Sequence, residues 1–149
     1  MLRLTKKMRF ALEAVVDIAY NARPEPVQSR EITKRQGIPQ RYLEQVMQQL
    51  VHANILKGVR GPKGGYTLAR ERRRISVGEI IRAIGDAEDN HDDMETSSAL
   101  GKTVINPLWD QMQDEMMRRF DAVTVEELCK RADTAKISPE QNRLADFNI

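Results

Sequence analysis

Two basic side chains lie within a short, glycine-rich stretch of this chain, where residues 60–65 read Arg-Gly-Pro-Lys-Gly-Gly. Cationic side chains on a bare turn are suited to contact phosphate groups, and glycine allows another backbone to approach closely. The flanking residues, 55–59 and 66–68, alternate in the manner of β-strands. The stretch therefore predicts a β-hairpin with Arg60 and Lys63 at its tip, and an ordinary solvated hairpin is the alternative.

A second set of polar side chains suited to nucleic acid lies just before this hairpin. They fall on one side of a predicted helix over residues 39–53, and the set is Gln40, Arg41, Glu44, Gln45 and Gln48. Such side chains can hydrogen-bond to base edges and phosphates, and they lie toward the helix N-terminus, where recognition helices contact DNA. The alternative is a glutamine-rich face that is merely solvated.

Other reactive residue types are scarce in the chain. It has two histidines, His52 and His91, and one cysteine, Cys129. The sequence offers no nucleophile–base set and no phosphate-binding glycine loop that opens a helix, which argues against an enzyme. We expect Cys129 to be a small core residue and His91 to be a solvated loop residue, and we expect no metal site.

The first helix is predicted to begin after Thr5, whose hydroxyl can cap it, and to run to about Ala22. Apolar residues recur along it at helical spacing, while Glu13 and Asp17 face away from the apolar side. This helix is therefore expected to supply one wall of a hydrophobic core.

A second short helix is predicted over residues 30–36, with Ser29 as its N-cap. Gly37 ends it and makes the turn into the helix at 39–53, and two helices joined in this way form a helix-turn-helix. The predicted fold class is mainly α with a small β-hairpin wing. It is a winged helix-turn-helix with a long C-terminal dimerisation helix.

Charge is divided unevenly along the 149 residues, although the net charge is only +2. Residues 1–85 carry 17 Lys and Arg against 7 Asp and Glu, whereas residues 86–149 carry 7 against 15. This asymmetry suggests that a basic part meets a polyanion and that an acidic part does not. Chance segregation of surface charge is the alternative.

The second half is predicted to be helical apart from one gap. Residues 76–79 form a capping box for a fourth helix over about 77–84, and an acidic connector follows. A long helix then runs from about residue 103 or 107 to 122. Its broad apolar side suggests dimerisation, packing within the same chain being the alternative. The apolar side consists of Ile105, Leu108, Trp109, Met112, Met116 and Phe120.

These elements predict three parts: a DNA-binding domain at 1–85, an acidic connector at 86–102, and a dimerisation helix with a helical tail at 103–149. No apolar run is long enough to cross a bilayer, and the N-terminus lacks the apolar segment of a signal peptide. The single cysteine agrees with a reducing compartment. We therefore expect a cytoplasmic protein that does not associate with membranes.

The combined motifs resemble those of the IscR–NsrR–CymR family of bacterial transcriptional regulators, from residue 2 to about 84 and again at Leu108-Trp109. These motifs are Leu4-Thr5, Gln36-Gly-Ile38, Tyr42-Leu43-Glu44-Gln45, Val59-Arg-Gly-Pro-Lys-Gly-Gly-Tyr66 and Val77-Gly-Glu-Ile80. The resemblance implies a dimeric winged helix-turn-helix repressor that binds double-stranded DNA at a near-palindromic operator. It also implies target genes in iron–sulfur cluster assembly, iron, nitric oxide or redox stress, or cysteine metabolism.

Individual roles follow from the resemblance by position. Arg41, Glu44 and Gln45 match the base-reading part of the third helix, and Arg60 matches the wing residue that enters the minor groove. Thr5 and Lys6 match a segment near the phosphates. The residues expected to contact DNA are Thr5, Lys6, Gln40, Arg41, Glu44, Gln45, Gln48, Arg60, Gly61, Pro62, Lys63, Gly64, Gly65 and Tyr66.

One departure from the family concerns its iron–sulfur cluster. Cluster-binding members have three cysteines between the fourth and fifth helices, whereas residues 86–106 contain none here. Alignment through Leu108-Trp109 puts Thr103 and Asn106 near the last ligand positions, and hydroxyl and amide groups are poor cluster ligands. We therefore expect no cofactor and a cluster-free, CymR-like member, with a metabolic enzyme as a candidate co-regulator. An adaptor that docks proteins on its acidic C-terminal half is the alternative function.

Overall fold

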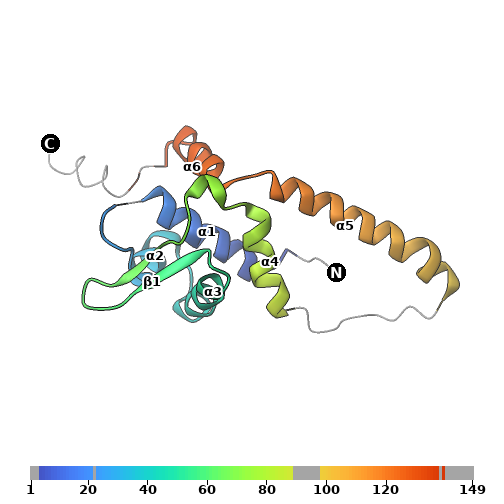
Figure 1. Ribbon diagram of the computed structural model, residues 1–149, viewed down its shortest axis with the longest axis horizontal. Coiled ribbons are helices and arrows are strands. Elements are labelled where there is room, and N and C mark those ends of the chain that lie inside the picture. The colour runs from blue at the N-terminus through green and yellow to red at the C-terminus, as the bar shows by residue number, and fades with distance from the viewer. Residues whose placement is uncertain (1–3, 22, 89–97, 138, 140–149) are drawn as a thin grey trace.

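The computed structural model describes residues 4–21, 23–88, 98–137 and 139 (Figure 1). The helices are α1 (Lys6–Tyr20), α2 (Ser29–Gln36), α3 (Gln40–His52), α4 (Val77–Glu88), α5 (Asn106–Asp121) and α6 (Val125–Thr134). The strands are β1 (Leu56–Val59) and β2 (Gly65–Leu68), and the shorter turns are the 3-10 helix η1 (Arg72–Arg74) and the π-helix η2 (Gly101–Ile105). The predicted mainly helical fold with a hairpin wing is confirmed.

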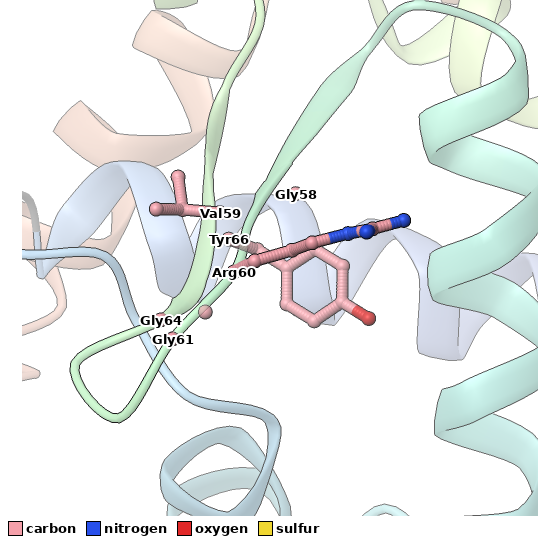
Figure 2. A pocket seen from close by; sticks show the side chains of 7 residues that line it. Gly58, Val59, Arg60, Gly61, Gly64 and Tyr66 are labelled. Carbon is pink, nitrogen blue, oxygen red and sulfur yellow. The ribbon is translucent and has the colours of Figure 1, made fainter.

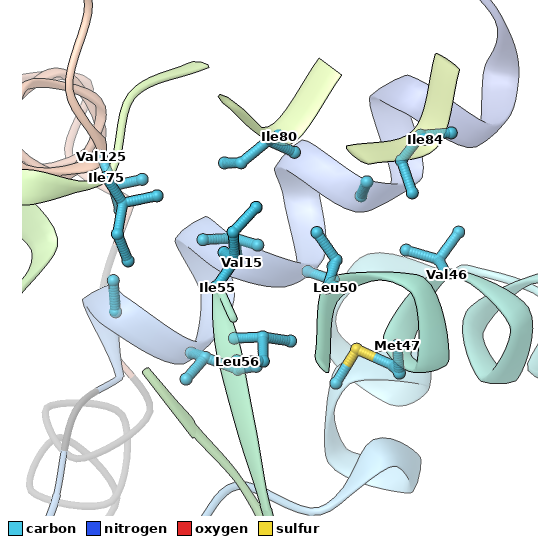
Figure 3. Packing of buried hydrophobic residues seen from close by; sticks show 14 of the residues in the cluster. Val15, Val46, Met47, Leu50, Ile55, Leu56, Ile75, Ile80, Ile84 and Val125 are labelled. Atoms are coloured by element: carbon cyan, nitrogen blue, oxygen red, sulfur yellow. The ribbon is translucent and has the colours of Figure 1, made fainter. Parts of the chain in front are cut away.

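A single hydrophobic core joins α1, α3, α4 and the start of the hairpin (Figure 3). Val15 of α1, Leu50 of α3 and Ile80 of α4 are fully buried in it. Apolar residues at helical spacing fall on one side of each helix, so three helices can share one interior. Full burial of one such side chain contributes about 1.5–3 kcal/mol of transfer free energy. The core is what fixes α3 and the wing relative to each other.

The wing is an antiparallel hairpin whose register pairs Leu56 with Leu68 and Val59 with Gly65. A third backbone segment joins it at Val27: the Val27 N–H donates to the Tyr66 carbonyl (2.9 Å), and the Tyr66 N–H donates to the Val27 carbonyl (2.8 Å). Since Val27 precedes α2, this bridge ties the wing to the start of the helix-turn-helix. A bridge of one residue has no sequence period, which is why the sequence did not predict it.

The helix α6 returns to the first half of the chain and completes its core. The Val77 N–H donates to the Val123 carbonyl (2.8 Å), and the Val125 N–H donates to the Ile75 carbonyl (2.9 Å). Val125 and Cys129 are buried in the same core, where α6 packs against α1 and η1. The segment predicted as a tail of the dimerisation part therefore packs against the winged helix-turn-helix.

The C-terminal end of α5 lies against α4, and its N-terminal half extends away from the other helices (Figure 1). Arg82 of α4 and Asp121 form a two-bonded ion pair, with Nη1–Oδ1 at 2.6 Å and Nη2–Oδ2 at 2.7 Å. The hydrogen bonds from Arg82 hold the pKa of the Asp121 carboxyl below its ordinary value. Gly78 is in contact with the same carboxylate, so a side chain there would displace it.

Some helix boundaries differ from the prediction. α4 continues to Glu88, past the predicted end at Ile84, because a helix can continue beyond the last residue of its buried stripe. The long helix begins before residue 103, since residues 99–100 and η2 are already helical. α1 ends at Tyr20, and its predicted end at Ala22 lies outside the described residues. Within the described ranges, no helix combines the length and the apolar character needed to cross a bilayer.

Candidate nucleic-acid interface

The five polar residues predicted on the third helix all lie on the exposed side of α3, namely Gln40, Arg41, Glu44, Gln45 and Gln48. The opposite side of α3 is completely buried and consists of Leu43, Val46, Met47 and Leu50. A helix of 3.6 residues per turn keeps such faces apart, so burial of one face fixes the direction of the other. The polar face is therefore presented to solvent by the core itself.

The helix α2, which precedes the turn, is capped differently from the prediction. Gln28 is its N-cap and Ser29 its first residue, because the Glu31 carboxylate accepts a hydrogen bond from the Gln28 N–H (2.7 Å). Glu31 also pairs with Arg23 (2.7 Å). Burial raises the pKa of the Glu31 carboxyl, but the hydrogen bonds from Gln28 and Arg23 outweigh this effect and lower the pKa overall. Gly37 ends α2 in the left-handed conformation at φ 67°, as expected of the turn.

A buried ion pair fixes α2 against α1. Asp17 is only 2% exposed, and its Oδ1 accepts from Arg35 Nη2 (2.8 Å). Its Oδ2 accepts from Arg35 Nε (2.9 Å) and from Gln36 Nε2 (2.8 Å). The prediction that Asp17 faces away from the packed side of the first helix was wrong, because α2 packs over it and supplies the compensating donors. This network sets the angle at which the helix-turn-helix is held.

The start of α1 lies beside α3. Thr5 caps α1 as predicted, since its Oγ1 accepts from the Met8 N–H (3.2 Å), and Lys6 begins the helix with an exposed side chain. The rings of Phe10 in α1 and Tyr42 in α3 are 5.9 Å apart between centroids. The N-terminal residues predicted to lie near phosphates are thus on an element that contacts α3.

The tip of the wing is a tight turn over residues 61–64, closed by a hydrogen bond from the Gly64 N–H to the Gly61 carbonyl (2.8 Å). Pro62 and Lys63 are its two central residues, and both are exposed. Gly61 has φ 112°, which side-chain-bearing residues rarely adopt, so the turn requires glycine at this position. Lys63 is therefore held at the outermost part of the hairpin, as predicted.

Arg60 lies between the turn and the strand β1, and its side chain points away from the tip, toward the side on which α3 lies (Figure 2). The ring of Tyr66 lies beside it in the same view, and Tyr66 of β2 pairs with Gly58 of β1. An open hollow in the wing is lined by Gly58, Val59, Arg60, Gly61, Gly64, Gly65 and Tyr66. Since four of these seven residues are glycines, a phosphate or sugar could approach the backbone closely. The hairpin prediction placed both basic residues at the tip, and the structure separates them.

Close packing also requires a glycine at the start of β2, next to the turn of the wing. A Cβ atom on Gly65 would collide with the Val27 carbonyl, the group that pairs with Tyr66. Gly65 thus allows the backbone of the wing to lie directly against the segment before α2. The wing and the helix-turn-helix are joined by backbone contacts rather than by flexible side chains alone.

The apolar residues predicted on the long helix fall into two groups. Ile105, Leu108, Trp109 and Met112 are 47–54% exposed, and Leu100 and Val104 nearby are exposed as well. Met116 is partly buried, and Phe120 is partly buried against the core of its own chain. The exposed apolar surface, which we call the α5 arm surface, is therefore formed by residues 100–112.

Metal-ligating residue types do not gather in the described part of the chain, where no group of three or more His, Cys, Asp or Glu residues is suitably placed for a metal ion. Cys129 is buried in α6, where burial raises the pKa of its thiol and the nearby Arg72 only partly offsets this. A thiol in such surroundings is a poor nucleophile. His91 lies outside the described residues.

The comparison with known families places most of the chain in one of them. Residues 4–131 match Rrf2, described as an iron-dependent transcriptional regulator. The HTH-type transcriptional regulator IscR of Cronobacter sakazakii is 33% identical over 97% of this chain and 90% of its own length. IscR of Escherichia coli strain K12 is also 33% identical, over 95% of this chain and 88% of its own.

Solved structures of such regulators share the fold. T. potens IscR superposes with a TM-score of 0.71 at 31% identity, covering 92% of this chain and 93% of that one. CymR, the global cysteine regulator of B. subtilis, has a TM-score of 0.70 at 27% identity, covering 88% and 98% respectively. These relatives are DNA-binding regulators rather than enzymes, and none of the comparisons supports the adaptor alternative.

Proposed function

Because the chain belongs to the Rrf2 family of DNA-binding transcriptional regulators, we propose that it is a repressor that binds a near-palindromic operator as a homodimer. The observation that carries this proposal is the pairing of two surfaces. One is the polar face of α3 with the basic wing beside it, and the other is the α5 arm surface. The first is suited to one half-site, and the second is suited to bring two half-site readers together.

In the proposed complex, α3 enters the major groove and the wing reaches the adjacent minor groove. Arg41, Glu44 and Gln45 contact base edges, since these side chains can donate to or accept from the groove edges of particular base pairs. Arg60 enters the minor groove, where a narrow groove concentrates negative potential. Lys63 contacts phosphate as a point charge from the turn.

The remaining predicted contacts support the position of the protein on the duplex. Lys6 is exposed at the start of α1, which contacts α3, and the first turn of α3 carries Gln40. We propose that Thr5 and Lys6 lie near the phosphates on one side of the major groove. Such contacts set register and affinity without reading sequence.

The homodimer is proposed from the exposed side chains of the α5 arm surface. Six large apolar residues between Leu100 and Met112 are 47–64% exposed. A contiguous apolar surface of this kind on a helix is stabilised when a second helix covers it. The same helix of a second copy would do so with the two-fold symmetry that a near-palindromic operator requires.

The regulated genes are proposed from the relatives. The structures of IscR and of the cysteine regulator CymR resemble this chain to a similar degree, with TM-scores of 0.71 and 0.70. We therefore propose target genes in iron–sulfur, iron, redox or cysteine metabolism without choosing among them. A metabolic enzyme remains the candidate co-regulator, and the cytoplasm the proposed location.

An iron–sulfur cluster does not fit the donor groups of this chain. Cys129 is its one thiol, and it is packed in the core on α6 rather than placed on η2. Thr103 and Asn106 in and beside η2 offer a hydroxyl and an amide, whereas clusters are held by thiolates. We therefore expect anaerobically purified protein to lack stoichiometric iron and sulfide. A visible absorption band with both elements present would contradict this expectation.

The test of the function is selection of bound duplexes from a random DNA pool, followed by fluorescence anisotropy at several salt concentrations. A near-palindromic consensus with affinity that falls as salt rises is the expected result. Gln45→Ala should change which bases are preferred, because Gln45 lies on the exposed face of α3. Recovery of no consensus at any salt concentration would exclude sequence-specific binding. Reporter expression with and without the selected site would separate repression from activation.

A further inference from the structure

A chain of hydrogen bonds runs across the surface from α2 to the exposed face of α3. The Thr33 hydroxyl donates to Gln40 Oε1 (3.0 Å), and Gln40 Nε2 donates to Glu44 Oε1 (3.3 Å). We propose that Thr33 and Gln40 are positioning residues, which hold the Glu44 carboxylate in place for base recognition. This inference rests on the proposed function, in which Glu44 contacts a base.

The direction of these bonds is imposed by the chemistry of the three groups. An ionised Glu44 carboxylate can only accept, so it requires the NH₂ end of the Gln40 amide. The carbonyl end of that amide must then face Thr33, whose hydroxyl can rotate to donate. If the amide were reversed, its carbonyl oxygen would face the carboxylate and repel it. Glu44 therefore fixes which end of the Gln40 amide it meets, and the Thr33 hydroxyl holds the other end in place by donating to it.

Holding the carboxylate matters more for specificity than for affinity. A glutamate side chain has several rotatable bonds, and fixing them in a complex costs conformational entropy. With Oε1 already bonded to Gln40, the other oxygen of Glu44 remains available to accept from a base. In the major groove a carboxylate matches the amino group of cytosine and repels acceptor atoms such as guanine O6. A loosely held carboxylate would discriminate less between these partners.

A purely structural role for the same bonds makes a different prediction. The contact of α2 with its neighbours is already secured by the buried Ile32 and by the Arg35–Asp17 ion pair. Thr33, Gln40 and Glu44 lie at the surface, where a hydrogen bond adds little to folding stability. Loss of the chain of bonds should therefore leave the fold intact and alter base preference.

The variants Thr33→Val and Gln40→Met test the inference without changing charge. Valine matches the shape of threonine and lacks the hydroxyl, and methionine matches the length of glutamine and lacks the amide. Glu44→Ala first identifies the base pair that Glu44 reads, by the position at which its selected consensus loses preference. At that position, discrimination by Thr33→Val and Gln40→Met should fall roughly two- to tenfold, the range of one or two modest hydrogen bonds.

The controls separate positioning from general damage. Thr33→Ser retains the hydroxyl and should restore discrimination, and Thr134→Val, at the exposed end of α6, makes the same atomic change far from α3. Binding to random DNA and its salt slope should match wild type in Thr33→Val, Thr33→Ser and Thr134→Val. Thermal unfolding measures whether any of them is destabilised.

The outcomes distinguish this inference from the proposed function. If wild type selects a consensus but Thr33→Val retains full discrimination at the Glu44 position, the positioning role is wrong and the function stands. A uniform loss across all positions with a lower unfolding temperature would show a structural role and would also overturn it. If wild type selects no consensus, the proposed function fails, and this inference fails with it.

Discussion

The polar face of α3 and the α5 arm surface are both exposed helix faces, but the rest of the chain supports them differently. The side of α3 opposite its polar face is wholly buried, and α2 in front of it is fixed by the buried Asp17–Arg35 pair. α5 is held mainly at its last turns, by the surface Arg82–Asp121 pair and by Phe120. One chain therefore completes the proposed DNA-binding surface by itself, whereas in the proposed homodimer a second copy covers the arm surface.

The largest effect is expected from charge on the arm surface at Met112 and on Met116, one turn beyond it on the same side of α5. Met112→Asp combined with Met116→Asp should convert the proposed dimer to monomers. Each new carboxylate would be buried without a partner against the apolar helix of the second copy, which costs on the order of several kcal/mol. Sedimentation velocity measures the shift, and affinity for a full operator should fall with it. Binding to a single half-site should change little.

A charge-matched control uses the opposite side of the same helix. Gln111→Asp with Arg118→Gln also changes the charge by two units, at exposed polar positions. This variant should remain dimeric. A Met112→Asp/Met116→Asp protein that still sediments as a dimer would show that the arm surface is not the interface.

Breaking the buried Asp17–Arg35 ion pair, which fixes α2 against α1, should give the next largest effect. Asp17→Ala leaves the Arg35 guanidinium, whose side chain is only 9% exposed, without its carboxylate. Breaking a buried pair from one side costs about 3–5 kcal/mol, which urea denaturation would measure. Glu13→Ala on the exposed side of α1 is the control and should stay within roughly 0.5 kcal/mol of wild type. A loss below about 1 kcal/mol in Asp17→Ala would mean that the pair contributes little to stability.

The contrast between the two regions also explains what the sequence could predict. The caps at Thr5 and at residues 76–79, the β-hairpin and the buried stripe of α3 are local patterns, and the structure confirms them. The Asp17–Arg35 pair joins residues 18 positions apart, so it depends on how α2 packs on α1. No local pattern distinguishes an aspartate that will be covered from one that will remain in water.

The sequence predicted which residues form the candidate site, but it did not predict the tertiary contacts that hold them in place. Its polar residues follow from the period of α3, whereas the Gln28 cap, the Val27 bridge and the packing of α6 depend on tertiary contacts. The contacts of the site residues with DNA remain predictions. Helical periodicity did predict the burial of Cys129, because this residue falls on the apolar side of its helix.

The two basic residues of the wing should have smaller and different effects. Lys63→Ala should weaken binding to operator and random duplexes alike and reduce the salt slope by about one counterion, because Lys63 projects from the turn as a point charge. Arg60→Ala should cost on the order of 1–3 kcal/mol at the operator and less on random DNA. Anisotropy with both duplexes at several salt concentrations separates these results. Equal losses for Arg60→Ala on the two duplexes would show that the wing contributes charge alone.

The smallest effect is expected at the anchor of the arm. Because Arg82 lowers the pKa of Asp121 in the folded protein, the pair stabilises the fold above the ordinary pKa of an aspartate, and this contribution is lost as the pH falls through the lowered folded value. Both side chains are 38–49% exposed, so a double-mutant cycle with Arg82→Gln and Asp121→Asn should give a coupling of only about 0.2–1 kcal/mol at neutral pH.

The same cycle repeated across pH and salt completes the comparison of the two ion pairs. The Arg82–Asp121 coupling should disappear in acid and weaken as salt rises, since exposed charges are screened. The Asp17–Arg35 pair is shielded from solvent, so added salt should weaken it far less. A coupling at Arg82–Asp121 that persisted at high salt and low pH would mean that the arm is anchored through packing around Gly78 and Phe120 rather than through charge.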